Sequence, residues 1–301
     1  MERVMAFPGV GTHYGALASD FSALLSVFPH LAEQFSEVLG CSLQEVVDNL
    51  EVWGQRPRWG TVIGVIYGIL LGHAWIDEHG PPDAFTGLSN GMYVACALSG
   101  ALSSTKTVDL CYQRGRLIEQ MTDGRTMMTG IVDEIEQLQL EAIVDEVQSE
   151  NLVEITGYNT PSQFVVGGTA QGVRSVLEKA LARHGSLIFE LGVPVAFHSS
   201  LMQGVNDRYV AEVLSQCRLT DPRSPVVSSI SGDVLDDGPS IRSHLARLLN
   251  RPVRFADVVH RCRDLGVEEW IIGGPGRTVL GLLPATEKTV LATRLSEVIG
   301  R

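Results

Sequence analysis

Short apolar strands and amphipathic helices follow one another along most of the chain. The pattern is sharpest in residues 124–194, where the strands are β-branched and the helices carry apolar residues at steps of three and four. In the first helix these apolar positions are Ile135, Leu138, Leu140, Ile143, Val144 and Val147. The predicted order there is strand, helix, strand, strand, helix and strand, at residues 127–132, 133–148, 151–157, 163–167, 170–184 and 186–191. This order is typical of a ferredoxin-like subdomain.

The residues on either side of that segment alternate strands with helices, as a mainly parallel sheet requires. The sequence therefore predicts an α/β protein with two parts. A small ferredoxin-like domain, residues 124–194, is inserted into a larger domain made of residues 1–123 and 195–301. A chain of 301 residues is long enough to give both parts a hydrophobic core.

One segment, residues 61–76, is almost wholly apolar ("TVIGVIYGILLGHAWI"). It is shorter than the roughly 18–20 residues that a membrane span needs, and it contains His73. The apolar run at the start of the chain is too short for a signal peptide. The sequence thus predicts a buried helix at 61–76 and a protein without a membrane partner.

The net charge and the cysteine content exclude further kinds of partner and site. The net charge of −12 argues against nucleic acid as a partner. The five cysteines are scattered and lack CxxC spacing, which indicates neither a disulfide framework nor a metal site. These features fit a reducing, cytoplasmic environment.

The stretch Gly87-Leu88-Ser89-Asn90-Gly91 lies between a predicted strand, 84–86, and a predicted helix, 92–102. A serine at such a corner is held in a strained turn with its hydroxyl pointing outward, and flanking glycines allow the turn. This arrangement suits a nucleophile. The same spacing also occurs in ordinary loops, so a purely structural turn stays open at this point.

Three glycines, Gly9, Gly11 and Gly15, follow a predicted strand at 4–7 in "FPGVGTHYG". A dinucleotide-binding loop is the rival interpretation, but the spacing is G-x-G-x-x-x-G and no suitably placed acidic residue follows. A tight turn that presents backbone N–H groups fits better.

Two further residues are candidates for chemistry. His198 follows an apolar stretch that predicts a strand, and it is a candidate base if a nucleophile lies nearby. A packed core histidine is the alternative. Arg114 lies in a helix of otherwise buried character, and its alternative, like that of Arg116, is an ordinary surface position.

Seven segments, taken in order, resemble motifs of the malonyl-CoA:acyl-carrier-protein transacylases, a family that includes the acyltransferase domains of polyketide synthases. The resemblance covers essentially the whole chain. The segments are FPGVGTH (7–13), GLSNGMYVA (87–95), RGRLIEQM (114–121), GYNTPSQFVVGG (157–168), VPVAFHSSLM (193–202), NRPVRF (250–255) and GGPGRTVLGLL (273–283).

The resemblance implies an α/β-hydrolase-like large domain, a ferredoxin-like small domain, and a catalytic role for each of several residues. Ser89 would be the nucleophile and His198 its base, with His198 oriented by the main-chain carbonyl of Leu248 or a neighbour. Backbone N–H groups of Val10 and Asn90 would form the oxyanion hole.

The resemblance also implies a substrate and partners. Arg114 would pair with the free carboxylate of malonyl, Gln163 would line that pocket, and Phe197 resembles the residue of the malonyl-selective form. Leu88 would be a further substrate-binding residue. Malonyl-CoA and an acyl carrier protein would be the substrates, with no cofactor and no metal.

Several positions depart from the family pattern and remove polar groups around the acyl pocket. The residues in question are Val10, His13, Leu88, Met92 and Ile272. They indicate a divergent transacylase, and an enzyme for an unusual acyl group stays open. So do a proofreading acyl hydrolase that uses the same serine and histidine, and a catalytically silent carrier-binding protein.

Overall fold

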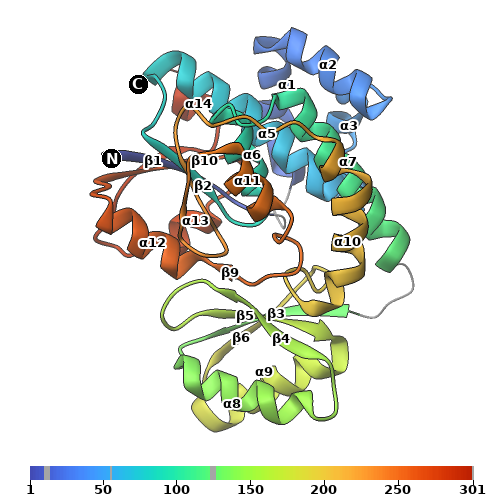
Figure 1. The fold of residues 1–301 in the computed structure, drawn as a ribbon, viewed down its shortest axis with the longest axis vertical. Helices are drawn as coiled ribbons and strands as arrows, with labels where there is room; N and C mark the ends of the chain where they lie inside the picture. Colours follow the sequence, from blue (N-terminus) through green and yellow to red (C-terminus); the bar gives the residue numbers. More distant parts are fainter. Residues whose placement is uncertain (10–13, 55, 123–126, 300–301) are drawn as a thin grey trace.

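The computed structural model describes residues 1–9, 14–54, 56–122 and 127–299. Within these residues the chain forms a six-stranded and a five-stranded β-sheet, each covered by helices (Figure 1). The predicted mixed α/β fold is therefore confirmed. The first motif of the sequence, 7–13, is described only as far as Gly9.

The larger sheet is mainly parallel, as predicted. Its strand order is β11-β10-β1-β2-β7-β8; every neighbouring pair is parallel except the last, in which β8 runs antiparallel to β7. The strands are β1 (Arg3–Phe7), β2 (Ala84–Gly87), β7 (Val226–Val227), β8 (Val234–Leu235), β10 (Glu269–Gly273) and β11 (Lys288–Ala292).

Alternate residues of β1 supply two separate cores, because successive side chains of a strand point to opposite faces. Met5 and Phe7 join the large cluster on one face, whereas Val4 and Ala6 join the cluster on the other. The second face is covered by α12 (Phe255–Asp264) and α13 (Thr278–Leu282). The first cluster takes side chains from η1 (Tyr14–Leu17), α1 (Ala18–Val27), α2 (Pro29–Leu39), α3 (Leu43–Asp48), α4 (Leu50–Gly54), α5 (Pro57–His79), α6 (Gly91–Leu98), α7 (Ser104–Thr122), η2 (Ser200–Met202), α10 (Gln203–Glu212), η3 (Leu214–Gln216), α11 (Gly238–Leu245) and α14 (Leu295–Val298).

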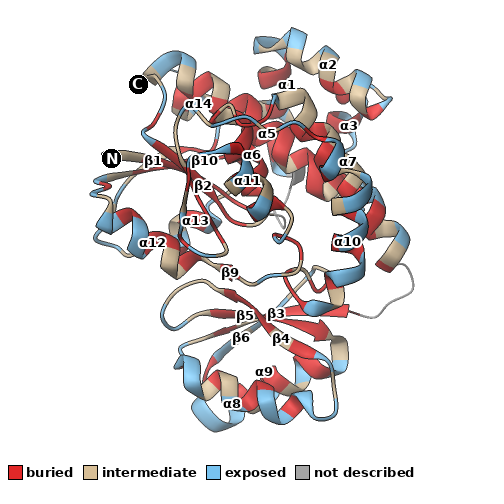
Figure 2. Ribbon diagram, viewed as in Figure 1, coloured by how far each residue is buried: buried red, intermediate tan, exposed pale blue. Residues whose placement is uncertain are grey.

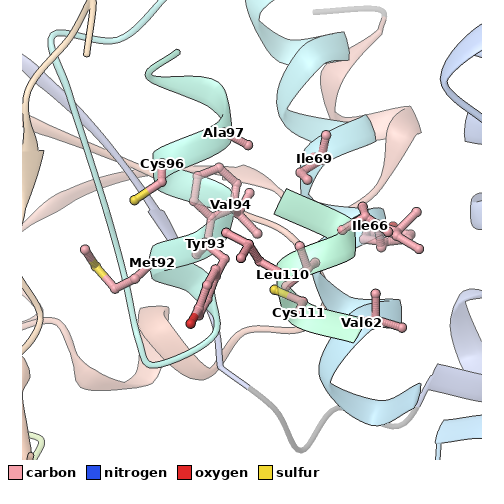
Figure 3. Packing of buried hydrophobic residues seen from close by; sticks show 14 of the residues in the cluster. Val62, Ile66, Ile69, Met92, Tyr93, Val94, Cys96, Ala97, Leu110 and Cys111 are labelled. Atoms are coloured by element: carbon pink, nitrogen blue, oxygen red, sulfur yellow. The ribbon is translucent and has the colours of Figure 1, made fainter. Parts of the chain in front are cut away.

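Helix α5 contains the apolar segment singled out in the sequence. It is long and apolar enough to cross a membrane, but 83% of its most apolar window is buried inside the protein. Its side chains pack against those of α6 and α7 (Figure 3). Gly115 brings α7 close to α5, because a Cβ there would lie only 2.6 Å from the Cα of Arg58. Helix α5 is thus a core helix, as predicted.

The smaller sheet has the order β6-β3-β5-β4-β9. Strands β3, β4, β5 and β6 pair antiparallel, and β9 adds in parallel to β4 from a distant part of the chain. Helices α8 and α9 cover one face and leave their own outer sides exposed (Figure 2). The elements are β3 (Met127–Asp133), α8 (Gln137–Gln148), β4 (Val153–Tyr158), β5 (Phe164–Thr169), α9 (Ala170–His184), β6 (Leu187–Leu191) and β9 (Val253–Arg254).

Three local predictions were wrong. The helix expected to reach residue 102 ends at Leu98, shortly before Gly100 adopts a positive φ of 85°. Residues 193–197 form a loop instead of a strand: Pro194 has no N–H to donate, and the Phe197 N–H bonds the Val195 carbonyl at 2.9 Å. Leu138, expected on the apolar side of α8, is 76% exposed.

Candidate active site

Ser89 lies in the sharp turn between β2 and α6. Its φ is +48°, a left-handed conformation that is rare for a residue with a side chain. The turn is held at both ends by backbone hydrogen bonds of 2.8 Å, from Leu88 N–H to the Phe7 carbonyl and from Gly91 N–H to the Leu88 carbonyl. The strained corner expected from the G-x-S-x-G spacing is present.

The two flanking glycines are required by close backbone approach. A Cβ on Gly87 would lie 2.3 Å from the carbonyl carbon of Gly91, and a Cβ on Gly91 would lie 2.3 Å from the carbonyl oxygen of Phe7. Any larger residue would force β1 and the turn apart.

His198 lies directly beside Ser89. The distance between Ser89 Oγ and His198 Nε2 is 2.7 Å, and His198 Nδ1 lies 3.2 Å from the Arg251 carbonyl oxygen. Because a carbonyl can only accept, Nδ1 carries the proton and Nε2 is left to accept the serine hydroxyl. The backbone of His198 is itself in a left-handed conformation, with φ +64°, and its N–H donates to the Leu249 carbonyl at 2.9 Å.

The surroundings of His198 favour the neutral imidazole. The pKa of His198 is lowered to about 4, chiefly by burial, and the nearby positive charge of Arg114 contributes to the lowering. Hydrogen bonds to the carbonyls of Leu248 and Arg251 act in the opposite direction. The orienting carbonyls therefore come from the segment expected, with the 3.2 Å bond made by Arg251 and a further contribution from Leu248.

Arg114 is a buried cation, with 2% of the residue exposed. Its Nη2 donates a hydrogen bond to Asn90 Oδ1, and its guanidinium carbon lies 4.5 Å from the centre of the Tyr93 ring. Tyr93 is held in turn by a 2.9 Å hydrogen bond from its hydroxyl to that of Tyr209. In the described part of the chain Nε has no hydrogen-bond partner and no carboxylate pairs with the guanidinium. Arg116, two residues further on, is exposed.

The remaining predicted site residues do not share one environment. Phe197 is half-buried, with its ring centre 6.4 Å from that of His198. Leu88 packs into the cluster on the α12 face of the sheet. The Gln163 amide bonds Asp133 at 2.7 Å and Asn159 at 2.9 Å, and no described contact joins it to the other site residues. Val10 lies outside the described residues.

Sequence reasoning missed the side chains that support the site. Asn90 had been considered only for its backbone, yet its side chain contacts Arg114. One feature of the sequence could have indicated a role for this side chain: Asn90 is polar at a position where the transacylase family carries leucine. Tyr93 and Tyr209 carried no signal, because both look like ordinary core aromatics in a single sequence.

A second histidine, His244, lies buried at the end of α11, just before the segment that orients His198. It is 1% exposed, its Nδ1 lies 2.9 Å from Ser228 Oγ, and its Nε2 has no partner among the described residues. The pKa of His244 is lowered to about 3, chiefly by burial, with a smaller contribution from the charge of Arg247. His244 is therefore neutral in the folded protein at pH 7.

Two surface cavities of the protein lie away from this site, and the described residues contain no metal cluster. The cavities, of about 750 Å³ and about 450 Å³, lie beside α10 and α11 and beside α1 and α14. Ser89, His198 and Arg114 line neither of them. In the same part of the chain, no group of three or more His, Cys, Asp or Glu side chains could hold a metal ion.

Comparison with known proteins identifies related chains over nearly the full length. The acyl transferase domain family matches residues 5–271. The malonyl CoA-acyl carrier protein transacylase of Bacillus subtilis (strain 168) is 27% identical over 97% of this chain and 92% of its own length. A non-reducing polyketide synthase of Aspergillus niger is 30% identical over 90% of this chain, which corresponds to 16% of the synthase.

Solved structures share the fold. A malonyl-transacylase in complex with a type II polyketide synthase acyl-carrier protein superimposes with a TM-score of 0.92 at 24% identity, covering 99% of this chain and 98% of that one. The enzyme MCAT from Streptococcus pneumoniae gives a TM-score of 0.91 at 24% identity, with the same coverage.

The Gly91→Ala substitution tests the turn. Its Cβ would overlap the Phe7 carbonyl, so we expect the free energy of unfolding to fall by about 1–3 kcal/mol. Urea unfolding measures this loss. Gly281→Ala is the control, because nothing lies within 4 Å of a Cβ at that helical position. Equal stability of the two variants would contradict the close approach.

His244 makes stability depend on pH. Its folded pKa is depressed below the ordinary 6.5, so the unfolded chain takes up a proton below pH 6.5 that the folded chain does not. Between pH 7 and pH 5 this group should cost about 2 kcal/mol of unfolding free energy. We therefore expect His244→Asn to lose about 2 kcal/mol less than the wild type over that range in urea titrations. His260→Asn, at a histidine whose side chain is 78% exposed, should lose as much as the wild type; an equal loss in all three proteins would contradict the prediction.

Proposed function

The chain belongs to the acyl transferase domain family, and we propose that it moves a malonyl group from coenzyme A to the phosphopantetheine thiol of an acyl carrier protein, in fatty-acid or polyketide biosynthesis. The observation that carries the proposal is a serine–histidine pair at 2.7 Å beside a buried arginine that lacks an anionic partner among the described residues. The related transacylases from Bacillus subtilis and Escherichia coli support it by name.

The first half of the reaction forms an ester on Ser89. His198 Nε2 takes the hydroxyl proton as Oγ attacks the thioester carbonyl of malonyl-CoA. The tetrahedral intermediate collapses, the carbon–sulfur bond breaks, and the coenzyme A thiolate receives the proton from His198. The 2.7 Å distance between the two side chains allows this transfer without rearrangement.

The second half reverses these roles. His198 Nε2 takes the proton of the carrier's phosphopantetheine thiol, and the resulting thiolate attacks the ester carbonyl. Ser89 Oγ leaves and recovers its proton from His198. A base with a pKa of about 4 is neutral at pH 7, so it is ready to accept a proton in both halves.

The oxyanion of each intermediate is proposed to bind backbone N–H groups of Asn90 and Val10. The Asn90 N–H directly follows the nucleophile at the start of α6 and makes no hydrogen bond within the described residues. Such a donor typically contributes about 3–4 kcal/mol to the transition state. Only backbone is required, so the side chains at these two positions are free to vary.

Arg114 is proposed to bind the free carboxylate of malonyl. A guanidinium presents two parallel N–H groups to a carboxylate, and a buried one that lacks a counter-ion gains most from such a partner. Phe197, half-buried beside His198, is proposed to fill the space that an α-methyl group would occupy. Leu88 and Gln163 make no described contact with these side chains, so we assign them no part in the chemistry.

The finer architecture is also a proposal. The antiparallel order β6-β3-β5-β4 with α8 and α9 on one face supports a ferredoxin-like domain at 124–194. The mainly parallel sheet with its serine turn supports an α/β-hydrolase-like domain made of 1–123 and 195–301. Strand β9 belongs to the second range but pairs with the small sheet, which ties the two parts together beside His198.

The proposed reaction needs no cofactor, since the acyl donor malonyl-CoA and the acceptor thiol of the carrier are both substrates. The negative net charge argues against nucleic acid as a partner. Five free cysteines support a cytoplasmic location.

Covalent chemistry at Ser89 is the direct test. Malonyl-CoA should leave one malonyl group on the intact protein, detected by mass spectrometry, and Ser89→Ala should abolish it. His198→Ala should slow acylation roughly 10²–10⁴-fold, the usual contribution of a positioned base. An adduct that persists in Ser89→Ala would overturn the assignment.

The fate of the adduct separates a transferase from a hydrolase in the same experiment. The malonyl ester should survive in buffer and disappear when an acyl carrier protein with its phosphopantetheine arm is added. Rapid loss to water without the carrier would instead favour the acyl hydrolase.

Arg114 should decide which acyl groups are used. Arg114→Ala should lose acylation by malonyl-CoA but keep or gain acylation by acetyl-CoA, which has no carboxylate to leave unpaired. Arg114→Lys should also be poor with malonyl-CoA, because a point charge does not reproduce the paired N–H groups. The exposed Arg116, changed to Ala, is the control and should alter neither rate. If Arg114→Ala lowers both rates equally, Arg114 has only a structural role.

A further inference from the structure

The side chain of Asn90 bridges two elements beneath the nucleophile. It is 5% exposed; its Nδ2 donates to the Thr61 carbonyl of α5 at 2.9 Å, and its Oδ1 accepts from Nη2 of Arg114. The two contacts fix the orientation of the amide. The Thr61 carbonyl can only accept, so the amide nitrogen must face it and the amide oxygen must face the guanidinium.

The other surroundings of the guanidinium are uncharged at neutral pH. One face lies over the Tyr93 ring at 4.5 Å, and Nε has no hydrogen-bond partner in the described ranges. No carboxylate among those residues forms an ion pair with it. A buried charge is costly unless an ion of opposite sign accompanies it, so this arrangement favours the arrival of an anion.

We propose that the Asn90 side chain is a specificity-determining residue, which orients Arg114 with a neutral amide and leaves its full charge for the carboxylate of the acyl group. This inference rests on the proposed function. An aspartate at this position would supply the anion internally and make a bound carboxylate redundant. Asn90 would thus favour carboxyacyl over neutral acyl groups through Arg114, without touching the substrate.

The place of Asn90 in the chain supports this role. It directly follows Ser89, so the same turn presents the nucleophile, a backbone N–H and the amide that holds Arg114. The Thr61 contact anchors the amide to α5, and the Tyr93–Tyr209 hydrogen bond fixes the ring beneath the guanidinium. The arginine is thereby held at a set position relative to Ser89 Oγ.

Two nearly isosteric variants separate charge from hydrogen bonding. For wild type, Asn90→Asp and Asn90→Leu, kcat/KM for acylation of Ser89 is measured with malonyl-CoA and with acetyl-CoA, and the ratio of the two values is compared. We expect Asn90→Asp to lower the ratio by more than about tenfold, because the new carboxylate pairs with Arg114. Asn90→Leu should lower it only severalfold. If Asn90→Asp keeps the wild-type ratio, or loses no more than Asn90→Leu, the inference is wrong.

The Arg114→Ala background provides an independent test. Both Asn90 substitutions should leave the ratio unchanged there, because they act through the guanidinium. If Asn90→Asp fails to fold, Asn90→Leu alone still tests the inference. A drop in the malonyl-to-acetyl ratio that is equal with and without Arg114 would overturn it. Absence of any malonyl adduct on the wild-type protein would instead refute the proposed function, which keeps the two failures distinct.

Discussion

The turn between β2 and α6 is the constraint on which the rest of the site depends. Ser89 adopts a left-handed backbone because β1 and the first residues of α6 approach so closely that only glycine fits at 91. The Leu88–Phe7 hydrogen bond extends the sheet into the turn, so the sheet itself holds the strained residue. One turn thereby fixes the direction of Ser89 Oγ toward His198 and of the Asn90 amide toward Arg114.

Much of the fold could be predicted because its periodicities are local. The helices and strands of residues 127–191 were found to within a few residues, since α8 and α9 each bury one regular face and the strands between them are short apolar runs. The stretch before His198 could not be assigned in this way, because its apolar residues lie in a loop that packs against the small sheet. There, Thr129 Oγ1 donates a hydrogen bond to the Val195 carbonyl. Apolar content alone does not distinguish such a loop from a strand.

Only part of the candidate site could be predicted from the sequence. Gly87 and Gly91 revealed the turn, but the approach of His198 to Ser89 depends on tertiary structure, and only the family resemblance indicated it. Three departures from the family pattern that lie in the described residues share an apolar environment. Met92 and Ile272 are fully buried among apolar side chains, and Leu88 nearly so, which suits apolar replacements. Asn90, by contrast, is a buried polar residue. Its hydrogen-bond partners lie on α5 and α7, so no periodic pattern in the sequence predicts these contacts.

On the proposed function, the charge of Arg114 also connects substrate binding to the base. With the acyl site empty, this charge is among the causes that depress the pKa of His198, so the imidazole resists protonation. On the proposed function, a malonyl carboxylate bound to Arg114 cancels that charge and removes this part of the depression. Protonation of Nε2, which both halves of the reaction require, then becomes easier when the carboxyacyl substrate is in place. A neutral acyl group would not provide this relief. Selection of the acyl group and activation of the nucleophile would thus depend on the same buried cation.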